Sequence, residues 1–242
     1  MPHTQVEEQV KIMLDAGINE IVLSGVDIGA YNDDGFGLVN LCRNLLEIIG
    51  DKDARIRISS IEPNNVTDDL IDLIAQANGK ICRHLHMPLQ SGSSKVLHEM
   101  ARHYDANEYL QVIEKLKRNI PSIALSTDII VGFPGETDAD FQDSIELSKK
   151  CAFMKIHVFP YSKRDGTPAA SRPDQISDEV KAARAKALRV LSDNLANADY
   201  KYRSGSTELI LIEDKNHART ESYHQIDAPK NVKVGDLISL KL

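Results

Sequence analysis

Polar and glycine-containing turns follow several apolar runs of the sequence, and their residue types could hold a charged or flat ligand. Four turns share this position, at residues 24–31, 59–63, 86–93 and 128–137. Carboxylates, imidazoles, hydroxyls and free backbone N–H groups can bind a ligand there by hydrogen bonds. Because parallel strands of a βα fold end at one face, the four turns predict a single ligand site. The alternative is that they only connect strands to helices.

Strand and helix patterns alternate with little linker between them. Apolar runs typical of strands lie at 19–24, 54–60, 81–87, 123–131 and 153–160, and helical patterns at 4–16, 37–49, 67–77, 93–100, 106–119 and 137–150. Repeated βα units predict an α/β fold with a parallel sheet and helices outside it. Five strands are too few for a closed eight-stranded barrel, which leaves a partial (β/α) barrel or a doubly wound sheet. Since such folds normally open on a strand, we expect a leading strand to be missing.

The C-terminal part of the sequence differs from the rest in composition and residue pattern. Residues 160–176 are rich in Pro, Gly, Ser and Asp and predict a loop, which a long helix follows at 177–202. The apolar positions of this helix are expected to form one stripe, at 180, 183, 187, 191, 195 and 198. Short alternating runs after Gly205 predict a small all-β module. The expected domains are 1–176, a connecting helix at 177–205 and a module at 206–242.

The net charge of −7 is unevenly distributed along the chain. Residues 1–148 carry −12, residues 149–203 carry +6, and residues 204–242 carry −1. A basic stretch beside an acidic body suits a polyanionic partner, and a solvated helix face is an equally good interpretation.

Composition places the chain among soluble globular proteins. Hydrophobic residues make up 42% and charged residues 27%, and no apolar run approaches the roughly 20 residues that a membrane helix needs. The N-terminus lacks the basic and apolar regions of a signal peptide. Three widely separated cysteines, Cys42, Cys82 and Cys151, favour reduced thiols and a cytoplasmic location over a disulfide framework.

Other site chemistries have weaker support. The eight histidines show no HExxH spacing, the cysteines are not paired, and no GxxxxGK loop exists, which argues against a zinc site and a P-loop. His84 and His86 share a strand face and suit hydrogen bonding to a cofactor better than metal ligation. An aldolase- or isomerase-like enzyme would need a Schiff-base lysine or an acid–base pair. No lysine lies in the four turns, and Glu62 and Asp128 are the available acids, so this interpretation ranks low.

Five runs together resemble one known family. They are Gly-Val-Asp-Ile-Gly-Ala-Tyr at 25–31, Arg-Ile-Arg-Ile-Ser-Ser-Ile-Glu-Pro at 55–63, and the segments 84–93, 128–137 and 157–167. In this order they resemble the radical S-adenosylmethionine methylthiotransferases over nearly the whole chain. The Ser-Ser-Ile-Glu-Pro variant is most similar to the branch that acts on threonylcarbamoyladenosine in tRNA. The closing β module resembles a TRAM domain, a small RNA-binding barrel.

The resemblance implies a fold and a chemistry. The fold is a partial radical-SAM-type (β/α) barrel with a small C-terminal all-β, TRAM-like barrel. In the family, a 4Fe–4S cluster cleaves S-adenosylmethionine to a radical that removes hydrogen from C2 of a modified adenosine at position 37, beside the anticodon. A second cluster supplies sulfur, and a second S-adenosylmethionine supplies the methyl group. The implied partner is the tRNA anticodon stem-loop, no membrane is involved, and a monomer is favoured.

Matching motifs imply roles for individual residues. The resemblance places the cofactor side at Gly25, Asp27, Ser60, Glu62, His86, Gln90, Ser91, Val131, Gly132 and Phe133. It places the sulfur-cluster and RNA side at Arg102, Tyr104, Tyr161, Ser162 and Arg164. Phosphate binding by the basic helix would use Arg184, Lys186 and Arg189, and base stacking on the β module would use Arg219 and Tyr223.

The sequence departs from the family at the cluster ligands. The CxxxCxxC loop and the family's N-terminal domain are absent from these 242 residues, and Cys42, Cys82 and Cys151 lack the spacing to replace them. We therefore expect a fragment of the enzyme that is inactive alone. The alternative is a non-catalytic, RNA-binding remnant of the same scaffold.

Overall fold

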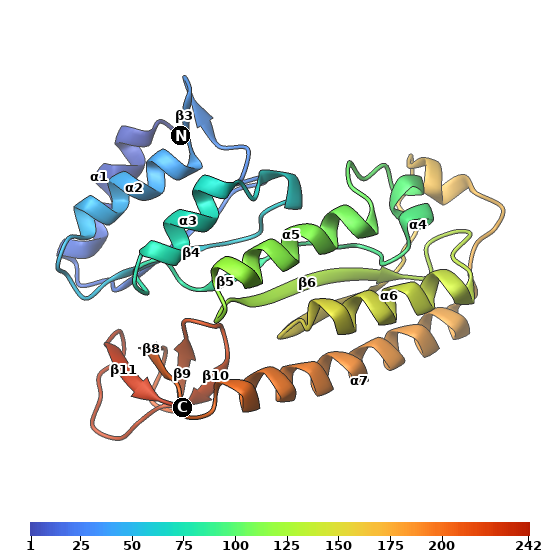
Figure 1. The fold of residues 1–242 in the computed structure, drawn as a ribbon. Helices are drawn as coiled ribbons and strands as arrows, with labels where there is room; N and C mark the ends of the chain where they lie inside the picture. Colours follow the sequence, from blue (N-terminus) through green and yellow to red (C-terminus); the bar gives the residue numbers. More distant parts are fainter. The chain divides into compact units, whose positions relative to one another are not determined.

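The computed structural model describes residues 1–242, and Figure 1 shows their helices and strands. The chain divides into two compact units. Unit 1 comprises Met1–His86, Leu116–Ala124 and Arg203–Leu242, and unit 2 comprises Met87–Lys115 and Leu125–Tyr202. No helix is both long enough and apolar enough to cross a membrane. The division of the chain at residues 176 and 205 stays a prediction.

The first part of unit 1 alternates helices and parallel strands as predicted. Its elements are α1 (His3–Asp15), β1 (Glu20–Leu23), β2 (Asn32–Asp33), β3 (Phe36–Gly37), α2 (Leu38–Ile49), β4 (Arg55–Ile58), η1 (Pro63–Asn65), α3 (Asp68–Gln76) and β5 (His84–His86). β1 pairs in parallel with β4, and parallel bridges join Ile56 to Ile81 and Ser60 to His86. The short β2–β3 hairpin was not predicted. Its signal is Asp34-Gly35, both with positive φ, which suits a tight hairpin turn.

The C-terminal part of unit 1 is an antiparallel sheet. It contains β8 (Thr207–Ile212), β9 (His217–Thr220), β10 (Gln225–Asp227) and β11 (Leu237–Lys241), in the order β10-β9-β8-β11. Ile210, Ile212 and Ala218 form its core. The all-β prediction is therefore confirmed. The sheet ends at β10 and β11 and does not close, however, so the predicted TRAM-like barrel is not confirmed.

Two arginines of β4 join the β module to the rest of unit 1. Arg55 and Arg57 are buried, and both pair with Glu20 of β1, at 2.6 and 2.8 Å. Their remaining N–H groups donate to backbone carbonyls of the module, including Leu209 at 2.6 Å and Thr220 at 3.2 Å. Burial opposes ionisation of Glu20, yet the hydrogen bonds and charges of the two arginines outweigh it and hold its pKa below the ordinary value.

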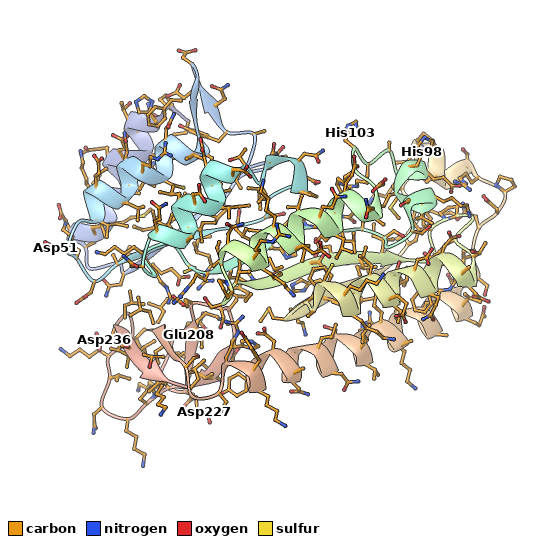
Figure 2. The ribbon with its side chains drawn as sticks, in the orientation of Figure 1. Asp51, His98, His103, Glu208, Asp227 and Asp236 are labelled. Atoms are coloured by element: carbon orange, nitrogen blue, oxygen red, sulfur yellow. The ribbon has the colours of Figure 1, made fainter.

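A second buried ion pair joins the end of α7 to the β module. Arg203, the last residue of α7, pairs with Glu208 at 3.2 Å, and both side chains are buried. The Ser222 hydroxyl donates to the other oxygen of Glu208 at 2.7 Å. Figure 2 labels Glu208 within the sheet, whereas Asp227 and Asp236 lie at its periphery. The module is thus fixed by charge-assisted hydrogen bonds as well as by its small apolar core.

Unit 2 carries the remaining βα elements. They are α4 (Ser94–Glu99), α5 (Ala106–Asn119), β6 (Ala124–Val131), α6 (Asp138–Cys151), β7 (Lys155–Pro160), η2 (Pro168–Ser171) and α7 (Asp178–Arg203), with the last residues of α5, the first of β6 and the last of α7 in unit 1. β6 and β7 are parallel, with Asp128 opposite His157. A capping box starts α6, because Thr137 and Asp140 exchange hydrogen bonds there.

The predicted apolar stripe of α7 is wrong. Val180 is 39% exposed, and positions 183, 187 and 198 face solvent. The buried face instead contains Arg184, Ala185, Leu188 and Ser192. Arg184 and Ser192 are polar, and each has a hydrogen-bonding partner in the protein. The spacing of hydrophobic residues alone could therefore not identify the buried face of α7.

We expect Glu20→Gln to lower the free energy of unfolding by about 3 kcal/mol at pH 7, because it leaves two buried guanidinium groups without their counter-charge. A carboxyl whose folded-state pKa is depressed stabilises the fold above its unfolded pKa, and this contribution is lost as the pH falls through the folded value. The difference between variant and wild type should therefore shrink on acidification. Urea unfolding at pH 7 and below pH 4.5 measures both effects.

Glu47→Gln is the matched control, since Glu47 is exposed on α2. Equal unfolding free energies for Glu20→Gln and Glu47→Gln would contradict this role of Glu20.

Candidate functional site

A cleft of about 580 Å³ opens at the carboxyl ends of β6 and β7 in unit 2. Five residues that we predicted as site residues line it, namely Gln90, Arg102, Tyr161, Ser162 and Arg164. Asp128, Ile130, Phe159, Pro160, Thr167 and Ala169 complete the lining. The volume is typical of small-molecule sites. The strand-end turns around residues 90 and 128 are thus brought together.

Gln90 has a strained backbone at the edge of this cleft. Its φ is +69°, which is uncommon for a residue other than glycine. Its N–H donates to the carbonyl of Asp128 at 2.8 Å, and its carbonyl accepts from the N–H of Ile130 at 2.9 Å. These backbone hydrogen bonds hold the strained residue against β6. The side chain of Gln90 therefore starts from a fixed backbone position at the edge of the cleft.

The turn after β6 is closed by the buried carboxylate of Glu136. Gly132, with a φ of +74°, and Phe133 donate their N–H groups to it at 2.8 and 3.4 Å. Arg184 of α7 pairs with it at 2.8 Å. Burial raises the pKa of Glu136 although Arg184 and the turn N–H groups favour its charged form.

This pair corrects the prediction for Arg184. We expected its guanidinium to face a phosphate, but it is buried and also bonds Asp138 at 2.7 Å. Lys186 and Arg189 are exposed on the same helix. Of the three basic residues of α7 predicted to bind phosphate, only Lys186 and Arg189 therefore present their charge to solvent.

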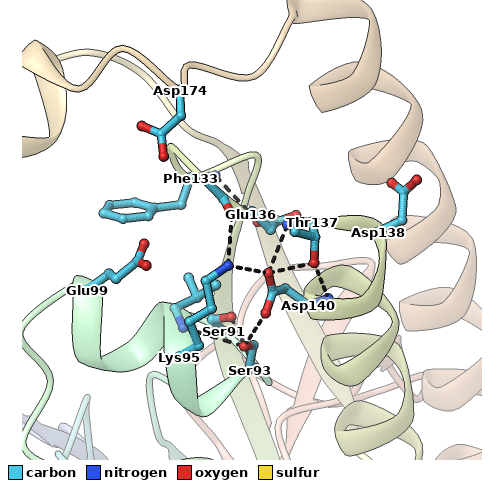
Figure 3. A network of polar contacts seen from close by, with 12 residues as sticks. Ser91, Ser93, Lys95, Glu99, Phe133, Glu136, Thr137, Asp138, Asp140 and Asp174 are labelled. Atoms are coloured by element: carbon cyan, nitrogen blue, oxygen red, sulfur yellow. Dashed lines mark hydrogen bonds and ion pairs between the residues drawn. The ribbon is translucent and has the colours of Figure 1, made fainter.

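A polar network around Asp140 fixes the turn that precedes α4 (Figure 3). The Ser93 hydroxyl donates to Asp140 at 2.7 Å, and Lys95 pairs with it at 2.9 Å. Although burial opposes ionisation, these groups and Thr137 hold the pKa of Asp140 well below its usual range. The Ser91 hydroxyl accepts from the Ser93 N–H at 3.2 Å and is buried, so it serves the turn and does not line the cleft.

A strap at residues 161–176 supplies five of the eleven residues that line the cleft. It starts where the Tyr161 N–H donates to the Val131 carbonyl at 2.8 Å. Arg172 then pairs with Glu99 of α4 at 2.7 Å and with Asp174, and its guanidinium lies 5.7 Å from the centre of the Phe133 ring. Figure 3 shows Glu99, Phe133 and Asp174 grouped beside the turn. Hydrogen bonds to Asp174 and Glu99 raise the pKa of Arg172 above the ordinary value for arginine.

Other predicted residues of unit 2 lie in its interior. Val131, Gly132 and Phe133 are buried beneath the strap. Tyr104 is also buried, and its hydroxyl donates to the Pro88 carbonyl at 2.9 Å. The expectation that Tyr104 faces the sulfur-cluster and RNA side is therefore corrected, because its buried hydroxyl satisfies a strand-end carbonyl instead.

A second, smaller cleft of about 350 Å³ lies in unit 1. Residues of α1 and β1 line it, together with Gly25 and Asp27. Asp27 accepts hydrogen bonds from the Ala30 N–H at 3.3 Å and from the Asn65 side chain at 3.1 Å. This carboxylate therefore organises its own turn as well as lining the cleft.

The remaining predicted residues of unit 1 lie at strand ends and on the β module. Ser60 bridges to His86, and the N–H of Ile61 donates to the His86 carbonyl at 3.0 Å, with Glu62 directly following. On the module, Arg219 pairs with Glu213 at 2.9 Å.

The Tyr223 ring is held by several side chains of unit 1. It stacks on His84 at 4.7 Å and lies within 4.9 Å of the guanidinium groups of Arg57 and Arg219. Its backbone has a φ of +74°, and 41% of the residue is exposed. The exposed part remains available to a partner.

Comparison with known proteins decides the family. The sequence pattern of the Radical SAM superfamily matches residues 1–148. The chain belongs to the radical SAM superfamily. Among solved structures, Escherichia coli coproporphyrinogen III oxidase (HemN), a radical SAM enzyme, matches with a TM-score of 0.57 and 16% identity over 78% of this chain and 46% of its own. The radical S-adenosylmethionine methyltransferase TsrM from Kitasatospora setae matches with a TM-score of 0.57 and 16% identity over 70% of this chain and 33% of its own. Both show the radical SAM fold.

Curated relatives of this radical SAM chain modify tRNA. The threonylcarbamoyladenosine tRNA methylthiotransferase MtaB of Bacillus subtilis is 40% identical over 90% of this chain and 48% of its own length. The tRNA-2-methylthio-N(6)-dimethylallyladenosine synthase of Clostridium botulinum is 40% identical over 86% of this chain and 46% of its own length. The chain thus spans about half the length of these relatives. Relatives of both kinds match equally well, so identity alone does not distinguish the two branches.

The cysteines of this radical SAM chain do not fit an iron–sulfur cluster. Superfamily members use S-adenosylmethionine and a 4Fe–4S cluster, which thiolates hold. Cys42, Cys82 and Cys151 are all buried and lie in separate elements. Burial raises the pKa of Cys42 and of Cys82 to about 12, which disfavours the thiolate. The cleft of unit 2 does offer S-adenosylmethionine polar groups and space.

We expect Arg172→Ala to speed hydrogen exchange in the strap at residues 161–176 by about tenfold or more, because the strap loses its charge-assisted bond to Glu99 of α4 and its internal pair with Asp174. Hydrogen-exchange mass spectrometry of the strap peptides measures this. Lys149→Ala, which breaks an exposed pair with Glu146 on α6, should leave the strap unchanged. Unaltered exchange in Arg172→Ala would show that the strap is held by other contacts.

Proposed function

We propose that this chain is the substrate-binding part of a radical SAM tRNA methylthiotransferase that modifies C2 of N6-threonylcarbamoyladenosine at position 37. The observation that carries the proposal is the cleft of unit 2, which gathers Gln90, Arg102, Tyr161, Ser162 and Arg164 at the ends of two parallel strands. The names of the tRNA-modifying relatives support the same reaction class.

The choice of threonylcarbamoyladenosine rests on the run Ser-Ser-Ile-Glu-Pro at 59–63. It follows β4, where radical SAM folds carry ligand-binding residues at the carboxyl ends of strands. Ser60 and Glu62 offer polar contacts, which suit a hydrophilic amino-acid substituent better than an apolar dimethylallyl group. MtaB of Bacillus subtilis, with the threonylcarbamoyl name, supports this branch.

In this proposal the chain binds and orients substrate and cofactor. S-adenosylmethionine, activated by a cluster, supplies the radical chemistry in the superfamily. Because the three cysteines here do not fit a cluster, we assign its ligands to the part of the relatives' length that this chain does not span. The residues of the unit 2 cleft would position the target nucleotide.

A non-catalytic RNA-binding protein is the second candidate. The burial of all three cysteines favours it, since no thiolate set within these 242 residues can hold a cluster. Both candidates predict binding of an anticodon stem-loop, and only the enzyme predicts that the modification state of position 37 changes.

We expect a stem-loop that carries threonylcarbamoyladenosine at position 37 to bind about tenfold more tightly than one that carries dimethylallyladenosine. A site built from hydrogen-bonding groups rejects an analogue that leaves them unpaired. Fluorescence anisotropy with both labelled stem-loops at fixed salt measures the ratio. Tighter binding of the dimethylallyl form would move the chain to the other branch, and no binding of either would contradict the proposal.

The double variant Lys186→Glu/Arg189→Glu should weaken binding of the stem-loop and reduce the slope of log affinity against log salt by about 1.5, because two phosphate contacts are lost. Lys11→Glu/Arg43→Glu changes the same charge on exposed positions of α1 and α2 and serves as control. Equal slopes for the two double variants would remove the exposed face of α7 from the RNA interface.

A further inference from the structure

The turn at residues 90–93 joins the cleft of unit 2 to the interior of that unit. Gln90 lines the cleft, whereas Ser91, Gly92 and Ser93 are buried behind it. A non-glycine residue with the positive φ of Gln90 persists only where its surroundings fix it. Two backbone hydrogen bonds to β6 fix Gln90 on one side. Its position therefore also depends on the contacts of the buried residues that follow it.

Two side chains of α6 hold the buried part of this turn. Asp140 and Ser144 lie four residues apart and therefore share one face of the helix. The Ser144 hydroxyl oxygen accepts a hydrogen bond from the Gly92 N–H at 2.8 Å. Asp140 accepts one from the Ser93 hydroxyl at 2.7 Å, which Figure 3 shows. Both acceptors are buried, so their loss would leave buried donors without partners.

Gly92 brings the turn very close to α6. A Cβ atom on Gly92 would lie 2.6 Å from the Asp143 carbonyl oxygen and would also overlap the Ser144 Cα. The turn therefore has no room to move toward the helix. Without the hydroxyl of Ser144, the Gly92 N–H can find another acceptor only if the turn moves away from α6, and Gln90 would move with it.

Ser148 offers a comparison within the same helix. It lies one turn after Ser144 and is also buried, but its hydroxyl donates to the Ser144 carbonyl at 2.7 Å. That hydrogen bond stays inside α6. The two serines thus have similar burial and differ in their contact with the turn.

We propose that Ser144 is a positioning residue, which sets the place of the Gln90 side chain in the cleft through the Gly92 N–H. The Gln90 amide offers both a donor and an acceptor to a ligand, and a small displacement misdirects both groups. The inference rests on the proposed function for the ligand, the nucleotide at position 37. It adds to that function a residue that does not itself line the cleft.

The side-chain amide signals of Gln90 in an NMR spectrum test the position without any ligand. They are assigned by their absence in Gln90→Ala. We expect Ser144→Ala to shift these signals by more than their linewidth, because the turn moves when the Gly92 N–H loses its acceptor. Ser148→Ala, the matched control, should leave them in place. Identical Gln90 signals in wild type and Ser144→Ala would overturn the inference.

Binding of the stem-loop that carries threonylcarbamoyladenosine tests the consequence. Ser144→Ala should weaken it about 3- to 10-fold, the loss expected for one misdirected hydrogen-bonding group. The same substitution in a Gln90→Ala background should have no further effect, because Ser144 acts through Gln90. Ser148→Ala should bind as wild type does. Fluorescence anisotropy at fixed salt measures all five proteins.

Ser144→Cys is a milder variant for the case in which Ser144→Ala does not fold. Its thiol keeps the shape of the side chain but is a weaker acceptor. We expect smaller shifts of the Gln90 signals and a smaller loss of affinity than in Ser144→Ala. Urea unfolding verifies that each variant is folded under the conditions of the binding assay.

The two failures are distinguishable. An affinity loss in Ser144→Ala that Ser148→Ala shares, or that persists in full without the Gln90 side chain, would show general destabilisation and would overturn the inference. A wild type that binds no stem-loop would contradict the proposed function instead. In that case the NMR signals of Gln90 still decide whether Ser144 positions this side chain.

Discussion

The buried carboxylate of Glu136 is the contact on which unit 2 depends. It closes the turn after β6 through the N–H groups of Gly132 and Phe133, and it holds α7 through Arg184. The same turn contacts the strap, because Arg172 lies over Phe133. The strap carries Tyr161 and Arg164, so this turn supports part of the cleft lining. A buried carboxylate with a raised pKa is costly, and its retention is explained by how many elements it positions.

Unit 1 uses the same principle with a different carboxylate. Glu20 receives two arginines from the neighbouring strand, and these arginines also bond carbonyls of the β module. The module has a small apolar core, so a large part of its attachment comes from these directional contacts. Such bonds fix an orientation more strictly than apolar packing does.

Local patterns in the sequence predicted most elements because the interactions that form them are local. Thr67 and Thr137 cap helices through residues three positions away, and the helix and strand patterns appear within short windows. The errors have the opposite cause. Arg184 is buried because of Glu136, 48 residues earlier, and Tyr104 because of the Pro88 carbonyl, so neither location follows from neighbouring residues. Phe159 was missed as a lining residue, although its alternation with His157 on β7 was a usable signal.

Mass spectrometry of nucleosides from tRNA tests the central claim most directly. The comparison is between cells with the intact gene and cells in which the segment encoding this chain is deleted. The account predicts that 2-methylthio-N6-threonylcarbamoyladenosine disappears, that its unmethylthiolated precursor accumulates, and that 2-methylthio-N6-dimethylallyladenosine is unchanged. Unchanged levels of both methylthiolated nucleosides would contradict the assignment of this chain to a tRNA methylthiotransferase.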